Sequence, residues 1–336
     1  MYSVYLKLTN RCNLKCKHCY IWKKKKWQGD ITEEVVEALI RQFPNGEHSK
    51  IILFGGEPTL YPPDKAKRLL EILKKGGWNE INIQTNLVSV NQEWVEIFKV
   101  YTKGHIGTSL DTSRIELGVV DKILANVKRL KKEGIDVSAV ITVTRDLTIN
   151  LFRELVNSFI KAGGYSFKVL PVNPNGREGK VEIEHYLDIL KVSLEIHKKF
   201  NNFENLLYLK RVFTEGVKGY YLGGNCAKYV RTVDPNGDVY VCPDLSGDKQ
   251  YCVGNLLDGS YEKNKTRVLS VWGYRVFYER EMFLGRSEGG CKGKDCFLYC
   301  SGGCTASSIT VNGNYLTKDP YCEAHRFLLE VIKNGT

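Results

Sequence analysis

Hydrophobic and polar positions in the first 200 residues alternate between a strand-like period and a helix-like period. In residues 2–9 every second side chain is apolar, whereas residues 31–43 carry apolar side chains at helical spacing. Repeated strand–helix units of this kind predict parallel strands with helices outside them. The predicted strands cover residues 2–9, 50–54, 80–85, 106–110, 137–144 and 165–170, and the helices cover 31–43, 64–75, 91–101, 118–133, 149–162 and 181–200.

This pattern fits either a partial barrel or a doubly wound sheet, and periodicity alone does not choose between them. In both architectures ligands bind at the carboxyl ends of the strands. The loop after the first predicted strand and the turn Gly55-Gly56-Glu57-Pro58 after the second are therefore expected on one rim. Two glycines in that turn allow a close backbone approach.

The composition is typical of a soluble globular protein, with 43% hydrophobic and 26% charged residues. No run approaches the ~18 apolar residues of a membrane span, and no secretory signal follows Met1. The net charge of +11 can attract an acidic partner. No nucleic-acid-binding module is visible. We therefore expect a cytoplasmic protein that binds neither nucleic acid nor membrane.

Eleven cysteines fall into two groups, with Cys12, Cys16 and Cys19 in the first and eight residues from Cys226 onward in the second. An odd number without a secretory signal argues against a disulfide framework. The C-x3-C-x2-C spacing also fits zinc poorly, because zinc sites use C-x2-C pairs or mixtures of cysteine and histidine. Three thiolates leave one iron of a four-iron cluster without a protein ligand. That iron is available to a substrate or cofactor.

The first cysteine group, followed by Tyr20 and later by Gly55-Gly56-Glu57-Pro58, resembles the radical S-adenosylmethionine (SAM) superfamily. The resemblance covers residues 1 to about 200 and implies a (β/α)6 partial TIM barrel. In that family the open iron of a 4Fe–4S cluster chelates the amino and carboxylate groups of SAM. One electron then cleaves SAM to a 5′-deoxyadenosyl radical.

The same resemblance implies residues that bind SAM. The Gly55–Pro58 turn would hold its amino group, with Glu57 accepting a charge-assisted hydrogen bond, and Tyr20 would pack by the adenine. The alternative for the polar residues at later strand ends is that they only form turns. By resemblance, the residues at these strand ends that contact the ribose and carboxylate are Asn86, Ser109, Asp111 and Arg145.

The second cysteine group resembles the SPASM extension of radical SAM enzymes, which typically holds two auxiliary 4Fe–4S clusters. Residues 234–238 are expected to form its hairpin turn. One departure is the C-x4-C-x3-C-x3-C spacing, in place of the usual C-x2-C-x5-C-x3-C. We predict a radical SAM barrel over 1–215 and a SPASM domain over 216–336. By resemblance, the outer cluster is held by Cys291, Cys296, Cys300 and Cys322, and the inner one by Cys226, Cys242 and Cys304.

Cys252 is left over, and no cysteine lies just upstream of Cys226, where many relatives have a fourth inner ligand. Cys252 is a candidate for that ligand. It is also a candidate catalytic thiol that donates a hydrogen atom or binds substrate, and a small buried hydrophobic residue. The sequence leaves the three alternatives open. If Cys252 is not a ligand, the inner cluster has an open iron.

The leading interpretation is an enzyme that abstracts a hydrogen atom from a peptide or protein side chain, because SPASM enzymes mostly mature peptides. The product would be a crosslinked, epimerised or oxidised residue, and the auxiliary clusters would take up the remaining electron or bind substrate. The expected partners are a flavodoxin- or ferredoxin-type reductant and a separate leader-binding protein, since Cys12 lies near the start. The alternative is a radical SAM dehydrogenase or cofactor-biosynthesis enzyme that acts on a small molecule.

Two other functions require different chemistry. A non-catalytic electron carrier would need neither an open iron nor the Gly-Gly-Glu-Pro turn, and SAM cleavage distinguishes it. A zinc-binding interaction module would be distinguished by metal analysis.

Overall fold

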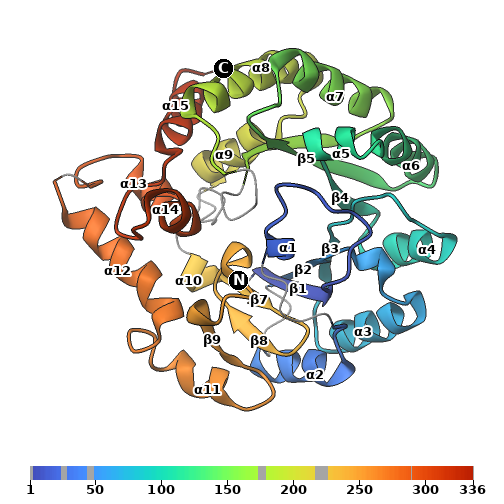
Figure 1. Cartoon of the computed structure of the whole chain (residues 1–336), viewed down its shortest axis with the longest axis horizontal. Helices are drawn as coiled ribbons and strands as arrows, with labels where there is room; N and C mark the ends of the chain where they lie inside the picture. Colours follow the sequence, from blue (N-terminus) through green and yellow to red (C-terminus); the bar gives the residue numbers. More distant parts are fainter. Residues whose placement is uncertain are drawn as a thin grey trace.

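The computed structural model describes residues 3–23, 29–43, 49–172, 179–215, 226–288 and 290–335. Strands lie at the centre and helices surround them (Figure 1). Among the described residues, no helix is both long and apolar enough to cross a membrane.

The six predicted strand–helix units are confirmed. Strands β1 to β3 pair in parallel with one another, as do β4 to β6, and a bridge between Gln84 and Gly107 joins the two sets. The strands are β1 (Ser3–Thr9), β2 (Lys50–Gly55), β3 (Glu80–Ile83), β4 (His105–Leu110), β5 (Asp136–Val143) and β6 (Ser166–Pro171).

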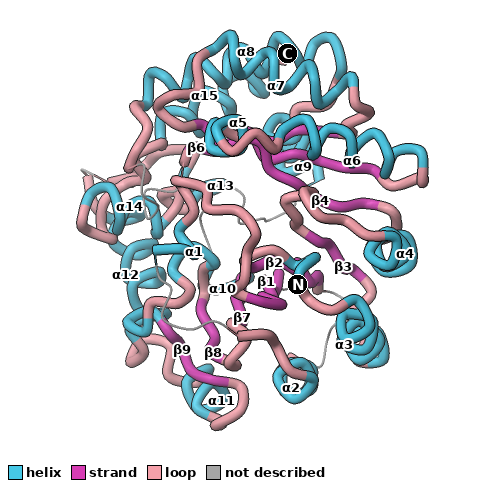
Figure 2. Tube along the Cα trace, turned by 45° about the vertical axis from the view of Figure 1, so that its right-hand side comes forward, coloured by secondary structure: helices cyan, strands magenta, loops and turns pink. Residues whose placement is uncertain are grey.

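The helices of these units lie outside the strands, as Figure 2 shows. A doubly wound sheet would carry helices on both faces, so the arrangement is the partial barrel. The helices are α2 (Glu33–Gln42), α3 (Pro63–Lys75), α4 (Gln92–Tyr101), α6 (Val120–Lys132), α7 (Ile149–Lys161) and α8 (Ile183–Phe200).

Local sequence explains these elements. In β5 buried residues alternate with partly exposed ones along its whole length, which is the period of a strand with two different faces. In α3 the buried residues Ala66, Leu69, Leu70 and Leu73 form one stripe at helical spacing. Two short helices at the rim, α1 (Tyr20–Lys23) and α5 (Thr112–Glu116), were not predicted.

The second region begins with α10 (Cys226–Tyr229) and a hairpin of β7 (Val230–Val233) and β8 (Asp238–Tyr240). The predicted turn at residues 234–238 is confirmed, with Gly237 at a φ of 86° and its N–H donating to Asp234 O at 2.9 Å. The hairpin also extends the barrel sheet, which the sequence did not indicate, because β7 pairs in parallel with β1. The sheet therefore continues in the order β3-β2-β1-β7-β8-β9, with β9 at Cys252–Asn255.

The second region also reaches the far edge of the barrel. Helix α15 (Cys322–Lys333) packs against α8 and α9 (Glu204–Glu215), as seen at the top left of Figure 1. Between β9 and α15 lie α11 (Ser260–Lys265), α12 (Trp272–Arg286), α13 (Phe297–Cys300) and α14 (Thr305–Asn312). The region thus spans from β1 to α8 and completes the ring. The boundary predicted between 215 and 216 adjoins the undescribed segment 216–225 and stays a prediction.

Candidate functional site

The loop after β1 and the turn after β2 are bound to each other by their backbones. Gly56 N donates to Thr9 O at 2.8 Å, and Glu57 N donates to Arg11 O at 2.7 Å. A Cβ on Gly56 would lie 2.0 Å from Arg11 O. The sequence assigned the two glycines to ligand approach, and the structure adds that the cysteine loop itself requires this space. The expectation that both motifs share one rim is confirmed.

The three cysteines of this loop lie close together. Burial, with smaller contributions from negative charge on Glu57 and Cys19, raises the pKa of Cys12 to about 11. Burial also raises the pKa of Cys16, with smaller increases from Cys19 and Cys12. Neutral thiols are therefore favoured until a metal supplies compensating positive charge.

One cation lies beside this triad, and the sequence analysis missed it. Arg114, on α5, lowers the pKa of both Cys12 and Cys16. Its guanidinium pairs with Asp111, the N-cap of α5, whose side chain is fully buried. Among the described residues, Arg114 Nε has no hydrogen-bond partner. The Asp-x-x-Arg spacing is readable as an N-cap with an i,i+3 ion pair, but nothing in it points to the cysteines.

His18 joins the same cluster of charges. Its Nε2 lies 3.7 Å from Asp111 Oδ2, and its Nδ1 lies 3.3 Å from Ser113 Oγ. Burial and the Arg114 charge lower the pKa of His18 to about 4, so the ring is neutral near pH 7. Asp111 therefore positions the cysteine loop through its contacts with His18 and Arg114.

Glu57 joins the ends of β2 and β3. Its carboxylate is 1% exposed and accepts from Thr59 N at 3.0 Å, Thr85 Oγ1 at 2.6 Å and Asn86 N at 2.6 Å. Burial raises the pKa of Glu57, and these hydrogen bonds oppose the increase. The carboxylate of Glu57 is thus largely engaged in hydrogen bonds within the protein, which the sequence did not indicate.

One cavity of about 510 Å³ lies at this rim and reaches the second cysteine region. It is bounded by ends of barrel strands on one side and by η3 (Pro243–Leu245) and the start of α14 on the other. Six of the nine residues predicted to bind SAM line it: Tyr20, Gly55, Gly56, Glu57, Asn86 and Ser109.

The other three do not line that cavity. Pro58 begins a short 3-10 turn and is buried. Asp111 is turned toward Arg114 and His18, as described. Arg145 is exposed, and its Nε donates to Lys180 O at 2.8 Å. All three residues are therefore outside the lining of the cavity.

A second cysteine triad, Cys226, Cys242 and Cys304, lines the same cavity. All three are strongly desolvated, and burial raises the pKa of each, to about 11 for Cys304. The charge of Asp244 raises the pKa of all three as well. The structure therefore brings together the residues predicted for the inner cluster and adds one carboxylate beside them.

The four cysteines predicted for the outer cluster also form a group. Burial, with smaller contributions from the charges of Cys296, Cys322 and Cys291, raises the pKa of Cys300 to about 12. Burial also raises the pKa of Cys322, and the charges of Cys296 and Cys291 add to that increase. The altered spacing of the first pair thus does not prevent the four thiols from meeting.

The turn between Cys300 and Cys304 depends on a buried arginine. Ser301, Gly302 and Gly303 all have positive φ, and a Cβ on Gly303 would lie 2.4 Å from Asp319 Cβ. The guanidinium of Arg280, from α12 and only 1% exposed, donates to Gly302 O at 2.5 Å and to Gly303 O at 3.0 Å. It also donates to Thr317 O and Ser308 Oγ. No sequence motif marked Arg280.

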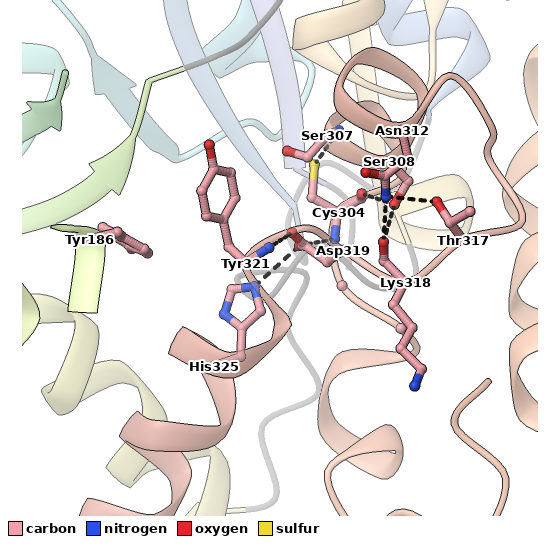
Figure 3. Close-up of polar contacts among 12 residues, drawn as sticks. Tyr186, Cys304, Ser307, Ser308, Asn312, Thr317, Lys318, Asp319, Tyr321 and His325 are labelled. Carbon is pink, nitrogen blue, oxygen red and sulfur yellow. Dashed lines mark hydrogen bonds and ion pairs between the residues drawn. The ribbon is translucent and has the colours of Figure 1, made fainter. Parts of the chain in front are cut away.

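Asp319 ties the inner cysteine triad to α15, as Figure 3 shows. Its carboxylate accepts from Cys304 N at 2.6 Å, Tyr321 N at 2.8 Å and His325 Nε2 at 3.2 Å. Burial alone would raise the pKa of Asp319, but His325 and the two N–H groups lower it overall. Asp319 and His325 line the cavity, and the sequence analysis missed both.

Cys252 lies elsewhere. It starts β9, and its thiol donates to Gly254 O at 3.3 Å. Burial raises its pKa, and the charged groups that act on it are Asp238 and Lys249 rather than other cysteines. It does not line the cavity. This placement favours the structural alternative over the ligand and the catalytic thiol.

Replacing Cys252 by alanine is therefore expected to leave the iron content per reconstituted chain unchanged. Replacing Cys242 is the matched comparison, because it removes a buried thiol from the triad. Iron and sulfide analysis of the two variants beside the unmodified protein measures the difference. A loss of iron in the Cys252 variant would instead show that Cys252 is a cluster ligand.

The arrangement of the three cysteine groups suits a cluster of irons and not a single metal ion. Among the described residues, no three Cys, His, Asp or Glu side chains converge on one point, as they would around a single metal ion. A four-iron cluster has a different requirement, because each cysteine binds its own iron. Two groups of three thiols and one group of four, all of them buried or partly buried, fit such clusters.

Comparison with known proteins gives one family and several relatives. Residues 6–159 match the radical SAM superfamily. The chain is 22% identical to the cysteine-type anaerobic sulfatase-maturating enzyme of Clostridium perfringens, over 95% of this chain and 92% of that protein. It is also 22% identical to the mycofactocin maturase of Mycobacterium tuberculosis, over 94% of this chain and 81% of that protein.

A solved structure supports the same fold. The structure of native anSMEcpe with bound AdoMet and the Kp18Cys peptide superposes with a TM-score of 0.78 at 18% identity. The alignment covers 98% of this chain and 96% of that one. A likeness of this extent includes the cysteine-rich second region as well as the barrel.

Proposed function

This chain is a radical SAM enzyme with a SPASM-type second region, and from that premise we propose that it modifies a peptide or protein side chain. In this proposal it cleaves SAM reductively and abstracts a hydrogen atom from the substrate. The superfamily binds SAM and a 4Fe–4S cluster. The two auxiliary clusters, and residues 216–336 as their domain, are part of the proposal.

One observation carries the proposal: both cysteine triads and six predicted SAM-binding residues line a single cavity. A cluster site far from the substrate could serve only electron transfer. In the proposal, a shared cavity would bring the site of radical formation, the substrate and a second redox site next to one another.

The residues of the first triad would hold the SAM-binding cluster. When bound, the cluster and SAM supply a 5′-deoxyadenosyl radical that takes a hydrogen atom from the substrate. Gly55 and Gly56 would face the methionine half of SAM, and Asn86 and Ser109, at the ends of β3 and β4, would lie along the same cavity. Asp111 and Arg114 act on the cysteine loop rather than on SAM.

The second region would hold the two auxiliary clusters, the inner one facing the cavity. In the proposal, the inner cluster would supply an acceptor for the electron left on the substrate after hydrogen abstraction. A peptide is favoured as substrate because the two relatives described above are named as a maturating enzyme and a maturase, and the anSMEcpe structure was solved with a peptide bound. A low-potential flavodoxin or ferredoxin and a leader-binding protein complete the proposed set of partners.

Anaerobic reconstitution tests this function. About twelve irons per chain are expected from three four-iron clusters, together with 5′-deoxyadenosine formed from SAM and dithionite. Substrate is then sought by deuterium transfer into 5′-deoxyadenosine from labelled peptides encoded beside the gene. About four irons per chain, or no deoxyadenosine, would contradict the proposal, and transfer from a small molecule alone would replace the peptide by that molecule.

A further inference from the structure

We propose that the carboxylate of Asp244 is the fourth protein ligand of the inner auxiliary cluster. This inference rests on the proposed function, because it requires that Cys226, Cys242 and Cys304 hold such a cluster. It replaces the open iron that the sequence implied for this site in the absence of a fourth cysteine. The inner cluster would then be held by three thiolates and one oxygen.

The fold places Asp244 beside all three thiols. It lies in η3, which starts immediately after Cys242, and the backbone N–H of Asp244 donates to the sulfur of Cys242. Asp244 and the three cysteines line the same cavity. Its negative charge acts on Cys226 and Cys304 as well as on Cys242. A short 3-10 turn therefore carries a cysteine and a carboxylate to one position.

Other donors are excluded one by one. The segment 216–225, where relatives carry the fourth cysteine, contains no cysteine, histidine, aspartate or glutamate. Cys252 lies on β9 with Asp238 and Lys249 around it. Asp319 is near Cys304, but its carboxylate already accepts from Cys304 N, Tyr321 N and His325. His325 directs its Nε2 to that same carboxylate (Figure 3).

The chemistry of the donor has a clear consequence. A carboxylate carries the same unit charge as a thiolate, so the net charge of the ligand set is preserved. Oxygen is a harder ligand to iron than sulfur. The iron bound by Asp244 would be retained in the resting protein, because it has a protein ligand. It would also differ from its three thiolate-bound neighbours in spectroscopic properties.

The test uses full-length protein in which Cys12, Cys16 and Cys19 are alanine, so that only auxiliary clusters load. After reconstitution with 57Fe, the parent protein is compared with Asp244→Ala and Asp244→Cys. Asp248→Ala is the matched control, because Asp248 lies four residues farther along the same loop and caps a separate 3-10 turn. The readouts are iron per chain, Mössbauer spectra and EPR spectra after mild oxidation.

The parent protein is expected to keep all irons on mild oxidation and to show one Mössbauer subsite with a larger isomer shift than the others. Asp244→Ala should lose about one iron per chain and give the EPR signal of a three-iron cluster. Asp244→Cys should retain the iron and lose the distinct subsite. Asp248→Ala should match the parent protein.

Two results would overturn the assignment. If the parent protein already forms the three-iron species on mild oxidation, the fourth iron has no protein ligand. If Asp244→Ala keeps the distinct subsite, another group supplies it. Failure of the proposed function is separable from both, because Cys242→Ala would then leave the iron content unchanged, showing that no inner cluster exists.

Discussion

Replacement of Cys16 by alanine is expected to abolish the formation of 5′-deoxyadenosine from SAM while auxiliary iron remains. Cys16 is buried between Cys12 and Cys19 and is one of the three proposed ligands of the SAM-binding cluster. With two ligands left, the cluster has no stable attachment to the loop. The expected iron content falls from about twelve to about eight per chain. Chromatographic assay of deoxyadenosine, run beside iron and sulfide analysis, measures both effects.

Lys15→Ala is the matched control for this result. Lys15 lies in the same loop, next to Cys16, and is exposed. Its variant should cleave SAM and hold iron like the unmodified protein. Cleavage that persists in the Cys16 variant would remove the loop from the proposed site, whatever the auxiliary iron does.

Replacement of Arg280 by methionine is expected to lower the free energy of unfolding by roughly 3–5 kcal/mol and to reduce auxiliary iron. The guanidinium is buried and satisfies the carbonyls of Gly302, Gly303 and Thr317. Methionine fills similar space but donates no hydrogen bond, so these carbonyls lose the hydrogen bonds that the guanidinium supplies. The turn between Cys300 and Cys304 then loses the contacts that hold both cluster ligands in place.

Denaturant unfolding of the metal-free protein and iron analysis of the reconstituted protein check this prediction separately. Arg275→Met provides the comparison on the same helix, because Arg275 is exposed and contacts Glu279 and Trp272 of that helix. Its effect should stay below about 1 kcal/mol. Equal losses in the two variants would show that α12 responds to any change of charge, and not to the buried contacts of Arg280.

The strands and helices of the barrel were predictable from the sequence because their signals are local. The strict alternation in β5 and the apolar stripe of α3 each arise within a few residues. Boundaries differ from the prediction by only one or two residues in most elements. By contrast, the pairing of β7 with β1 joins residues more than two hundred positions apart. No short-range periodicity specifies which strand edge a distant hairpin will meet.

The candidate site divides in the same way. Cysteine spacing and the Gly-Gly-Glu-Pro turn are short motifs, so both could be identified along the chain. The roles of Asp111 and Arg145 as direct SAM contacts were predicted from strand-end positions, and neither side chain lines the cavity. Whether a strand-end residue faces inward depends on the local turn. At Asp111 that turn starts a helix and directs the carboxylate to Arg114.

The buried charged residues show most clearly what could not be predicted from the sequence. Arg114, Arg280 and Asp319 have no spacing that distinguishes them from surface residues of the same kind. Their burial results from elements that meet only in the folded protein: α5 against the cysteine loop, and α12 and the segment before α15 against the Cys300–Cys304 turn.

The sequence by itself determined the alternating strand–helix units, the two groups of cysteines and the rim shared by the first two motifs, because each follows from local periodicity or spacing. The choice of a partial barrel came from the family resemblance. Only the tertiary structure decided that two cysteine triads face one cavity, that Cys252 stands apart and that Asp244 lies beside the inner triad. Those relations depend on side-chain burial and on contacts between residues far apart in the chain. Such contacts come into being when the second region pairs with β1 and packs against α8.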